Sequence, residues 1–418
     1  MLKKGLLILI LLLLWLPLME KFCRYFKINV LNGAIVYHSK PVLSQKIWFT
    51  AGYQKEYELY FNDTIGFHNE LIRLRNQIDY SLFNKCHSYD TEMGKEGFLF
   101  PINQYATYLG KTKTAEGIFD FMIEQLAVLN DTLKAHNKNL ILIFAPTKGA
   151  VHRSVAPDWC DDKKVAESDH DYLIRKARGA NINCLDFYSW FNQGKFNYDV
   201  FTKMGAHWST YAGALAGDSM VHYFEKLHKC DLPDVKFSRV EVVDTPRYQD
   251  DDLFKALNLF SQTPKDTYRY LTMQYEKSNK SKVNALFISD SFFFTFHYLP
   301  GEVFENYAFW FYNNRIYSDD SNQGKYVKDL DLKSEIDRYD DIVLMATEWN
   351  LANLGWGFIE NALNLYGIKV TKSVDYFKRI IKNDAKWFKQ IQEKAVKNKI
   401  SVEEQLTQDA NYMLSISK

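Results

Sequence analysis

Two residues that lie far apart in this 418-residue chain have the chemistry of a nucleophile and its base. Ser291 stands in the segment LFISDSFFF, just after the apolar run Asn284–Ile288. A serine at the end of a buried parallel strand projects into the mouth of an α/β sheet, where the amides of the next turn can stabilise an oxyanion. His207 stands in KMGAHWSTYAG, at a turn that leads into a helix; an imidazole titrates near neutrality and can accept the serine proton. Each residue also has an ordinary explanation, a helix-capping serine and a turn histidine, so the hypothesis depends on the fold bringing them together.

Four further residues are candidates for holding a substrate. Lys148 follows the apolar run LILIFA in the segment FAPTKGAVHR, where its cation is a candidate for positioning a reactant. Trp208, Phe293 and Trp310 are the aromatic candidates, because a ring offers apolar area to a sugar face and helps to exclude water. Core packing is the ordinary alternative for each ring in a chain that contains 27 Tyr and 30 Phe.

Apolar runs alternate with helical periodicity and predict the elements that must position these side chains. The run LILIFA lies between an amphipathic stretch and a proline, which is typical of a parallel strand covered on both faces. Strands that alternate with helices predict an α/β fold, a doubly wound parallel sheet with flanking helices and a site at the C-terminal ends of its strands. The predicted strands are 97–100, 140–145, 182–185, 284–288 and 341–346, and the predicted helices are 65–83, 116–136 and 209–227.

The N-terminus predicts the location of the protein. Lys3 and Lys4 precede the apolar run Leu6–Met19, and no small-x-small cleavage site follows it. This pattern favours an uncleaved signal anchor in the cytoplasmic membrane, with the lysines in the cytoplasm and the rest of the chain facing the periplasm or the cell exterior. No later apolar run is long enough to cross a bilayer, so we expect a single anchor rather than a multi-pass channel.

Composition narrows the classes of function. The formal net charge is +1, which argues against a nucleic-acid-binding protein. Neither a metal-ligand cluster nor a glycine-rich phosphate loop stands out, so no metal and no cofactor are expected. The five cysteines lack CxxC spacing, and Cys160 with Cys184 is the expected pair if one disulfide forms.

The order of five segments resembles a known family. FNDTIGFHNELIRLRNQ, GKEGFLF, PTK, GAHWSTYAG and ISDSF follow one another between about residues 60 and 370. Together they resemble the SGNH-hydrolase-like family of alginate-type O-acetyltransferase accessory proteins. The resemblance implies an outward-facing SGNH domain beside a multi-pass membrane-bound O-acyltransferase that delivers acetyl groups to an exported polysaccharide. It also implies that Ser291 becomes acetylated and that His207 is its general base.

The chain differs from this family at the residue that orients the histidine. The family's segment is Asp-x-His-Trp, and Gly205 stands in place of the aspartate. Losing the orienting carboxylate costs a serine protease roughly 10⁴-fold in turnover. Three outcomes are open: another carboxylate replaces it, a backbone carbonyl orients His207 in a slower dyad, or the site is inactive. Glu348 is the candidate carboxylate because it follows the strand 341–346 at the same sheet edge; its ordinary alternative is an acid in a first helical turn.

Three functions therefore compete. The first is O-acetylation of a cell-surface or secreted polysaccharide through an acyl-enzyme at Ser291. The second is the same chemistry ending on water, a carbohydrate O-acetyl esterase. The third is a catalytically inactive glycan-binding or assembly scaffold, which Gly205 favours.

The sequence also predicts how the chain is divided. The C-terminal stretch has the spacing of amphipathic helices, and Ser401–Glu404 resembles a capping box that opens the last of them. The predicted parts are a signal anchor at 1–24, a connector at 25–60, an SGNH-hydrolase-like domain at 61–374 and a helical extension at 375–418.

Overall fold

A six-stranded sheet forms the centre of the computed structural model, which describes residues 2–33, 36–49, 52–88, 90–110, 113–160, 167–275, 280–296, 299–318 and 320–416. The strand order is β4-β3-β10-β7-β8-β9. All neighbouring pairs are parallel except β8 with β9, an antiparallel pair at the edge. The strands are β3 (Asn139–Ala145), β4 (Asn183–Asp186), β7 (Val283–Ser289), β8 (Phe304–Phe311), β9 (Arg315–Ser318) and β10 (Asp341–Thr347).

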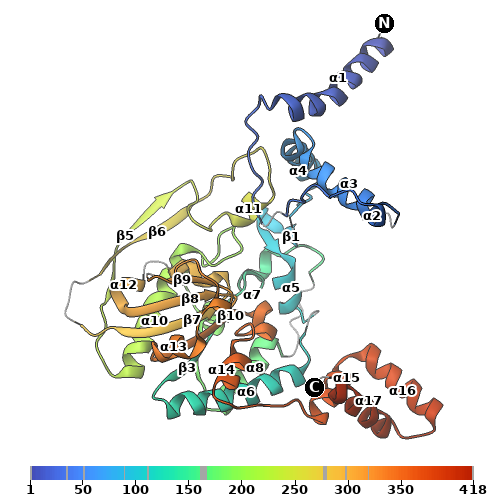
Figure 1. Cartoon of the computed structure of the whole chain (residues 1–418). Coiled ribbons are helices and arrows are strands. Elements are labelled where there is room, and N and C mark those ends of the chain that lie inside the picture. Colours follow the sequence, from blue (N-terminus) through green and yellow to red (C-terminus); the bar gives the residue numbers. More distant parts are fainter. Residues whose placement is uncertain are drawn as a thin grey trace.

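Helices cover both faces of the sheet, so the predicted doubly wound α/β fold is confirmed (Figure 1). Along β3, Leu140, Leu142 and Phe144 join one core, and Ile141 and Ile143 join the other. This alternation follows from the two-residue period of a strand. The first core is completed by α6 (Glu116–Ala135), α8 (Asp169–Gly179) and α14 (Phe358–Leu365), and the second by α9 (Phe187–Gln193) and α10 (Thr210–His228).

The chain order explains where a site can form. β10 is the last strand in sequence, yet it lies between β3 and β7, with Ile342 opposite Leu140 on one side and Leu286 on the other. The segments after β7 and β10 therefore leave the sheet as neighbours at its C-terminal edge. Such an edge is where parallel α/β sheets place their ligands.

Two small sheets lie outside the central one. β1 (Thr91–Met93) pairs with β2 (Leu99–Pro101), and β5 (Val235–Val243) pairs with β6 (Tyr268–Tyr275). The sequence analysis predicts neither β5 nor β6. The segment between them carries the short helix α11 (Asp252–Ala256), which packs beside β2.

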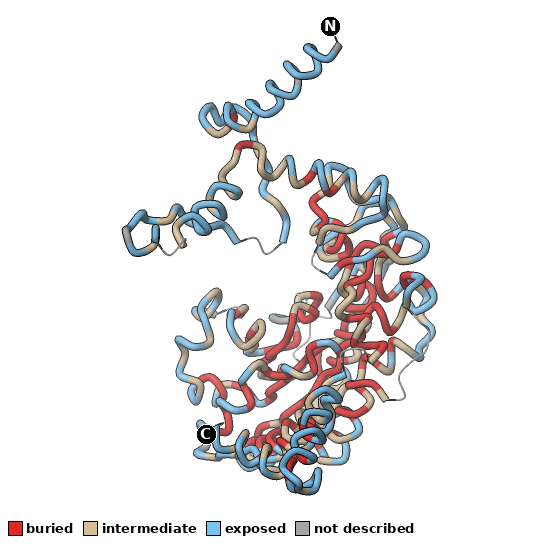
Figure 2. The backbone as a smooth tube through the Cα atoms, turned by 90° about the vertical axis from the view of Figure 1, so that its right-hand side faces the viewer, coloured by how far each residue is buried: buried red, intermediate tan, exposed pale blue. Residues whose placement is uncertain are grey.

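The N-terminal part is largely exposed (Figure 2). It contains α1 (Leu2–Cys23), α2 (Gln45–Phe49), α3 (Gly52–Thr64) and α4 (His68–Phe83), so the predicted connector includes two helices. Residues Lys3–Cys23 of α1 are long and apolar enough to cross a membrane, and 6% of that stretch is buried.

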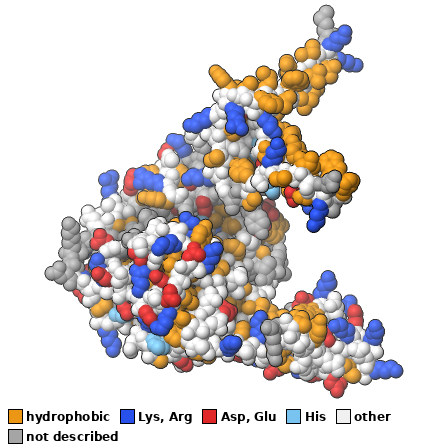
Figure 3. Space-filling model, in the orientation of Figure 1, with side chains coloured by type: hydrophobic (Ala, Val, Ile, Leu, Met, Phe, Trp, Pro, Cys, Tyr) orange, Lys and Arg blue, Asp and Glu red, His pale blue; other side chains and the backbone are white. Residues whose placement is uncertain are grey.

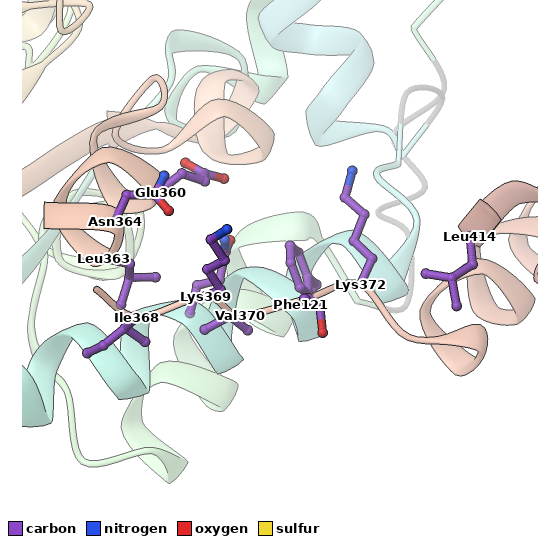
Figure 4. A pocket seen from close by; sticks show the side chains of 11 residues that line it. Phe121, Glu360, Leu363, Asn364, Ile368, Lys369, Val370, Lys372 and Leu414 are labelled. Carbon is purple, nitrogen blue, oxygen red and sulfur yellow. The ribbon is translucent and has the colours of Figure 1, made fainter. Parts of the chain in front are cut away.

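The C-terminal helices form a unit beside α6. They are α15 (Val374–Asn383), α16 (Ala385–Asn398) and α17 (Val402–Ile416), and they share an apolar cluster of their own. Ser401 and Glu404 bond reciprocally at the start of α17, as the predicted capping box requires. A cavity of about 610 Å³ lies between this unit, α6 and α14. Figure 4 shows Phe121, Val370 and Leu414 on its walls.

The expected bridge between Cys160 and Cys184 is wrong. None of the five cysteines forms a disulfide. The Cys184 thiol instead donates a hydrogen bond to the carbonyl of Ile182, at 3.4 Å.

Candidate active site

Ser291 and His207 meet at the C-terminal edge of the sheet. Ser291 is the first residue of the 3₁₀ turn Ser291–Phe296, directly after β7, and His207 precedes α10, whose N-cap is Ser209. The Ser291 hydroxyl lies 2.7 Å from His207 Nε2. With the ring in the tautomer whose Nδ1 carries the proton, the hydroxyl donates to Nε2, as a nucleophile does to its base.

The carboxylate that orients this ring is Asp252, which the sequence analysis missed. Asp252 Oδ2 lies 2.5 Å from His207 Nδ1 and accepts its proton. The other oxygen, Oδ1, accepts hydrogen bonds from the backbone amides of Ala206, at 2.7 Å, and Leu253, at 2.8 Å. Three donors therefore fix the carboxylate, and the carboxylate fixes the imidazole.

The electrostatics of this pair favour a charged couple. Burial opposes the imidazolium of His207, but the carboxylates of Asp252, Asp290 and Asp250, with Asp252 contributing most, together outweigh burial and raise the pKa of His207 above its ordinary value. Burial likewise opposes ionisation of Asp252, yet the charge of His207 and the hydrogen bonds to the carboxylate lower the pKa of Asp252.

The prediction that Glu348 orients His207 is wrong. Glu348 follows β10 at the expected edge, but its buried carboxyl interacts with His170 and Tyr188. The chain turns directly after β10 into a 3₁₀ segment, Glu348–Asn353, and both ring nitrogens of His207 are engaged by other residues, Asp252 and Ser291. Burial raises the pKa of Glu348 to about 7.

Close packing explains why residue 205 is glycine. A Cβ at Gly205 would lie 2.8 Å from Thr202 Oγ1, 3.0 Å from the carbonyl oxygen of Gln249 and 3.1 Å from that of Asp250. An aspartate there would collide with the segment that carries Asp252. The run Asp250–Asp252 in YQDDDLF is the sequence signal that could have suggested a second source of the carboxylate.

Lys148 supports the histidine segment rather than facing a substrate. Its side chain is fully buried, and Nζ donates hydrogen bonds of 2.8 Å to the carbonyls of Lys203 and Gly205. Burial lowers the pKa of Lys148 well below its ordinary value, against the opposing charge of Asp252. The substrate-binding prediction for Lys148 is therefore corrected to a positioning role.

The three predicted aromatic platforms are core residues. Trp208 is buried, and its indole N–H donates to Thr295 Oγ1 at 2.6 Å. Phe293 stacks among the rings of the second core, and Trp310 is buried in the first core. None of the three presents a face to solvent, so the ordinary alternative, core packing, holds for each.

Asp290 holds the turn that carries Ser291 in place. Its Oδ2 accepts from the Thr347 amide at 3.0 Å and from Asn350 Nδ2 at 2.9 Å, and Oδ1 accepts from the Phe292 amide at 3.1 Å. The carboxylate thus ties the turn after β7 to the turn after β10. The Phe292 amide of this turn is thereby engaged by Asp290.

Tyr312 brings a hydroxyl to Ser291. Its side chain interacts with those of Ser291 and Asn350, and burial together with the charge of Asp290 raises the pKa of Tyr312, so the phenol stays protonated. Tyr312 has a positive φ of 50°, directly after β8. Its ring lies edge-on to Trp356, with 5.0 Å between the ring centroids. The sequence analysis did not identify Tyr312, because nothing in its local segment distinguishes it from the chain's other tyrosines.

The site has the parts of a serine acyl-transfer centre. It places a serine hydroxyl on an imidazole, a carboxylate on the other ring nitrogen and a protonated phenol beside the serine. In the part of the chain that the structure describes, no three His, Cys, Asp or Glu side chains group as metal ligands.

A protein-family model matches residues 92–291, a stretch that runs from β1 to the candidate nucleophile. The model is ALGX, the SGNH hydrolase-like domain of the acetyltransferase AlgX. The resemblance expected from the sequence is thereby confirmed. No curated protein matches the chain.

Solved structures with a related arrangement share little sequence with the chain. The O-acetyltransferase domain of Pseudomonas putida AlgJ has 14% identity and a TM-score of 0.44, over 66% of this chain and 99% of that one. Pseudomonas aeruginosa AlgX has 14% identity and a TM-score of 0.43, over 68% of this chain and 69% of its own. Bacillus cereus PatB1 has 11% identity and a TM-score of 0.42, over 62% and 97%.

Proposed function

From the match of residues 92–291 to the SGNH hydrolase-like acetyltransferase family, we propose that this chain transfers acetyl groups to a polysaccharide. The observation that carries the proposal is the continuous hydrogen-bonded line Ser291–His207–Asp252, with distances of 2.7 and 2.5 Å. Family resemblance alone leaves open whether a chain with Gly205 is active; the carboxylate of Asp252 is the reason to propose that it is.

The proposed reaction has two halves. His207 Nε2 takes the proton of Ser291 Oγ as Oγ attacks the acetyl carbonyl; the intermediate collapses, and His207 returns the proton to the leaving group. In the second half, His207 takes the proton of a sugar hydroxyl, which attacks acetyl-Ser291. The ester bond to Ser291 breaks, Oγ recovers the proton from His207, and the acetylated sugar leaves. Asp252 stabilises the imidazolium in both halves.

Tyr312 is the proposed oxyanion donor. Negative charge develops on the carbonyl oxygen in each tetrahedral intermediate, and a neutral, preorganised hydroxyl next to Ser291 stabilises that charge. Asn350 supports Tyr312 and is itself held by Asp290.

The acceptor and the location are part of the same proposal. A half-buried ring, Trp356, lies against Tyr312 and is the aromatic group that we assign to the acceptor sugar, in place of Trp208, Phe293 and Trp310. We assign α1 as the anchor in the cytoplasmic membrane, with the sheet domain on the outer side and a membrane-bound O-acyltransferase as donor partner. The proposal also includes the predicted division of the chain into an anchor at 1–24, a connector at 25–60, an SGNH-hydrolase-like domain at 61–374 and a helical extension at 375–418.

Product analysis tests the reaction. The purified full chain is incubated with p-nitrophenyl acetate, with and without a soluble oligosaccharide, and both acetate and O-acetyl sugar are measured. Transfer predicts O-acetyl sugar at the expense of acetate, whereas an esterase yields acetate alone. Ser291→Ala should abolish both products. In cells that carry only the Ser291→Ala variant, unchanged acetylation of the polysaccharide would favour the scaffold alternative.

A further inference from the structure

Helix α4 is amphipathic, but its polar face is turned toward the protein. Arg73 is 8% exposed and Asn76 is 4% exposed, whereas Leu74 is 48% and Leu82 is 71% exposed. A surface helix of a globular protein normally has the opposite arrangement, with its apolar stripe against the core.

Hydrogen bonds explain the inward polar face. Arg73 donates to the carbonyls of Asn29, at 3.1 Å, and Val30, at 2.6 Å. Asn76 Nδ2 donates to the carbonyl of Leu257 at 2.8 Å. The amide oxygen of Gln77 accepts from the backbone N–H groups of residues 260 and 261. These bonds fix the rotation of the helix, so the outward face is set by the fold.

The outward face is a continuous apolar stripe. Leu71, Leu74, Ile78 and Leu82 recur at helical spacing and are each at least 45% exposed. Exposure of one such residue is ordinary, but four on one line mark a surface that another phase or molecule covers. We call these four residues the α4 stripe.

The neighbouring contacts indicate what covers the α4 stripe. Gly66, two residues before α4, packs so tightly on α1 that a Cβ there would lie 2.0 Å from the carbonyl oxygen of Pro17 and 2.9 Å from the Lys21 amide. The rings of Phe26 and Phe67 lie 5.4 Å apart. The start of α4 is therefore held against the end of the apolar run of α1. If α1 crosses a bilayer, that end lies at the boundary between the acyl chains and the headgroups.

Charge and ring positions suit the same boundary. Lys21, Arg24 and Lys27 follow the apolar run within eight positions, and Arg75 projects from α4 beside the stripe with 71% of its side chain exposed. Cations at this depth attract lipid phosphates, and exposed aromatic rings such as Tyr25 favour the interface. Figure 3 shows apolar side chains along α1 and over the N-terminal helices next to it.

We propose that the α4 stripe lies in the headgroup–acyl boundary of the bilayer that α1 crosses. The bilayer then holds α4 by its apolar side and the protein holds it by its polar side, so the sheet domain is fixed relative to the membrane surface instead of hanging on a flexible tether. The inference rests on the proposed anchor, although it is independent of the chemistry at Ser291.

Spin-label accessibility tests the inference. The exposed Cys23 is changed to serine, and one cysteine is introduced in each variant, Leu74→Cys or Ile78→Cys. The introduced thiol is labelled with a nitroxide, and the full chain is reconstituted into vesicles of phosphatidylcholine and phosphatidylglycerol. Leu12→Cys in α1 reports the anchor, and Val396→Cys, on the exposed face of α16, is the control in water. The Cys23→Ser chain with no added cysteine measures how far the four remaining native thiols are labelled.

We expect the ratio of oxygen to nickel-chelate collision rates at positions 74 and 78 to exceed that at 396 several-fold. High nickel accessibility at 74 and 78 would overturn the inference, as would low accessibility to both reagents, which indicates a protein contact such as a second copy. A lipid signal at position 12 with an aqueous one at 74 would refute the α4 assignment alone. An aqueous signal at 12 would refute the anchor itself, and the inference with it.

Discussion

Three consecutive aspartates have three different roles at this site. The buried Asp250 carboxylate accepts from the Thr210 amide, and burial raises the pKa of Asp250 to about 6. Asp251 pairs with Lys255 and accepts from Thr263. Only Asp252 faces His207. Identical side chains thus differ in function because the start of α11 turns them in different directions.

Replacing Asp252 by asparagine should lower kcat/KM by roughly 10³- to 10⁴-fold, because the imidazole loses both its orientation and its counter-charge. The base must be neutral, so activity in the wild type falls as pH drops through the raised pKa of His207. Without the carboxylate, burial dominates and lowers that pKa, so the acid limb should move to lower pH. Ester hydrolysis measured across pH gives both quantities.

Asp251→Asn is the matched control. Asp251 is the same type of residue as its neighbour Asp252, but it contacts Lys255 and Thr263 instead of the His207 ring. It should leave the acid limb in place. If Asp252→Asn retained wild-type kcat/KM and the same acid limb, Asp252 would not be the orienting carboxylate.

Tyr312→Phe removes one hydroxyl while keeping the ring against Trp356. We expect kcat to fall about 10²- to 10³-fold with little change in KM, because an oxyanion donor acts on the transition state more than on the bound substrate. Tyr326→Phe, at an exposed ring that lies over Arg315, is the control and should be silent. Steady-state kinetics with p-nitrophenyl acetate separate the two parameters; an equal loss in both variants would remove Tyr312 from the mechanism.

At the scale of elements, the histidine is placed by backbone contacts of the segment before α10. Lys148, at the start of the short helix after β3, grips the carbonyls of Lys203 and Gly205, and the Ala206 amide bonds to Asp252. Two elements that are distant in sequence, the helix of Lys148 and the start of α11, therefore hold the four residues before His207. Gly205 is the point where this segment and the loop before α11 come closest.

Adding a methyl group at this contact should be destabilising. We expect Gly205→Ala to lower the free energy of unfolding by about 1–3 kcal/mol, because the Cβ meets backbone carbonyls that cannot move aside easily. Gly205→Asp, which introduces the aspartate of the family's segment, should also lower activity, because its side chain would collide with the segment that carries Asp252. Gly179→Ala is the control: nothing lies within 4 Å of its Cβ, and it ends α8. Chemical denaturation compares the two; equal stability would show that the contact is loose.

The sequence could predict the parts of the site that depend on local patterns, but not those that depend on contacts between distant segments. The periodicity of 140–145, 284–288 and 341–346 reports burial on both faces, and those strands form at the predicted positions, each only one or two residues longer than predicted. Ser291 was predictable because its position follows from the strand before it. Asp252 was not, because its approach to His207 depends on how an insertion between β5 and β6 folds back, and no local pattern records that. The aromatic residues were misassigned for a similar reason, since burial of a ring is decided by tertiary packing.

At the scale of the whole molecule, two polar clusters lie at the C-terminal edge of the sheet. The candidate site uses Ser291 and His207. The other cluster contains Glu348, His170 and Asp186; His170 Nε2 lies 2.9 Å from Asp186 Oδ1 and stacks on Tyr188. Burial opposes the imidazolium, but the neighbouring carboxylates outweigh it and raise the pKa of His170. Glu348 joins this cluster from the end of β10, so its protonation is coupled to the stability of the sheet rather than to the reaction.

The pH dependence of stability should report Glu348. Its pKa is about 7 in the folded protein and near 4.5 for an ordinary glutamate, so the folded state binds the proton more tightly than the unfolded state between these values. Stability is therefore lost as pH rises through that window, by on the order of 3 kcal/mol from this group. Glu348→Gln cannot ionise, and its free energy of unfolding should fall less steeply between pH 5 and pH 8 (roughly the window above).

Urea denaturation across pH measures this slope; Glu360→Gln, at an exposed glutamate of α14, should keep the wild-type slope. Identical slopes in all three proteins would mean that Glu348 is ionised and solvated in solution, and that the buried arrangement at the end of β10 does not hold there.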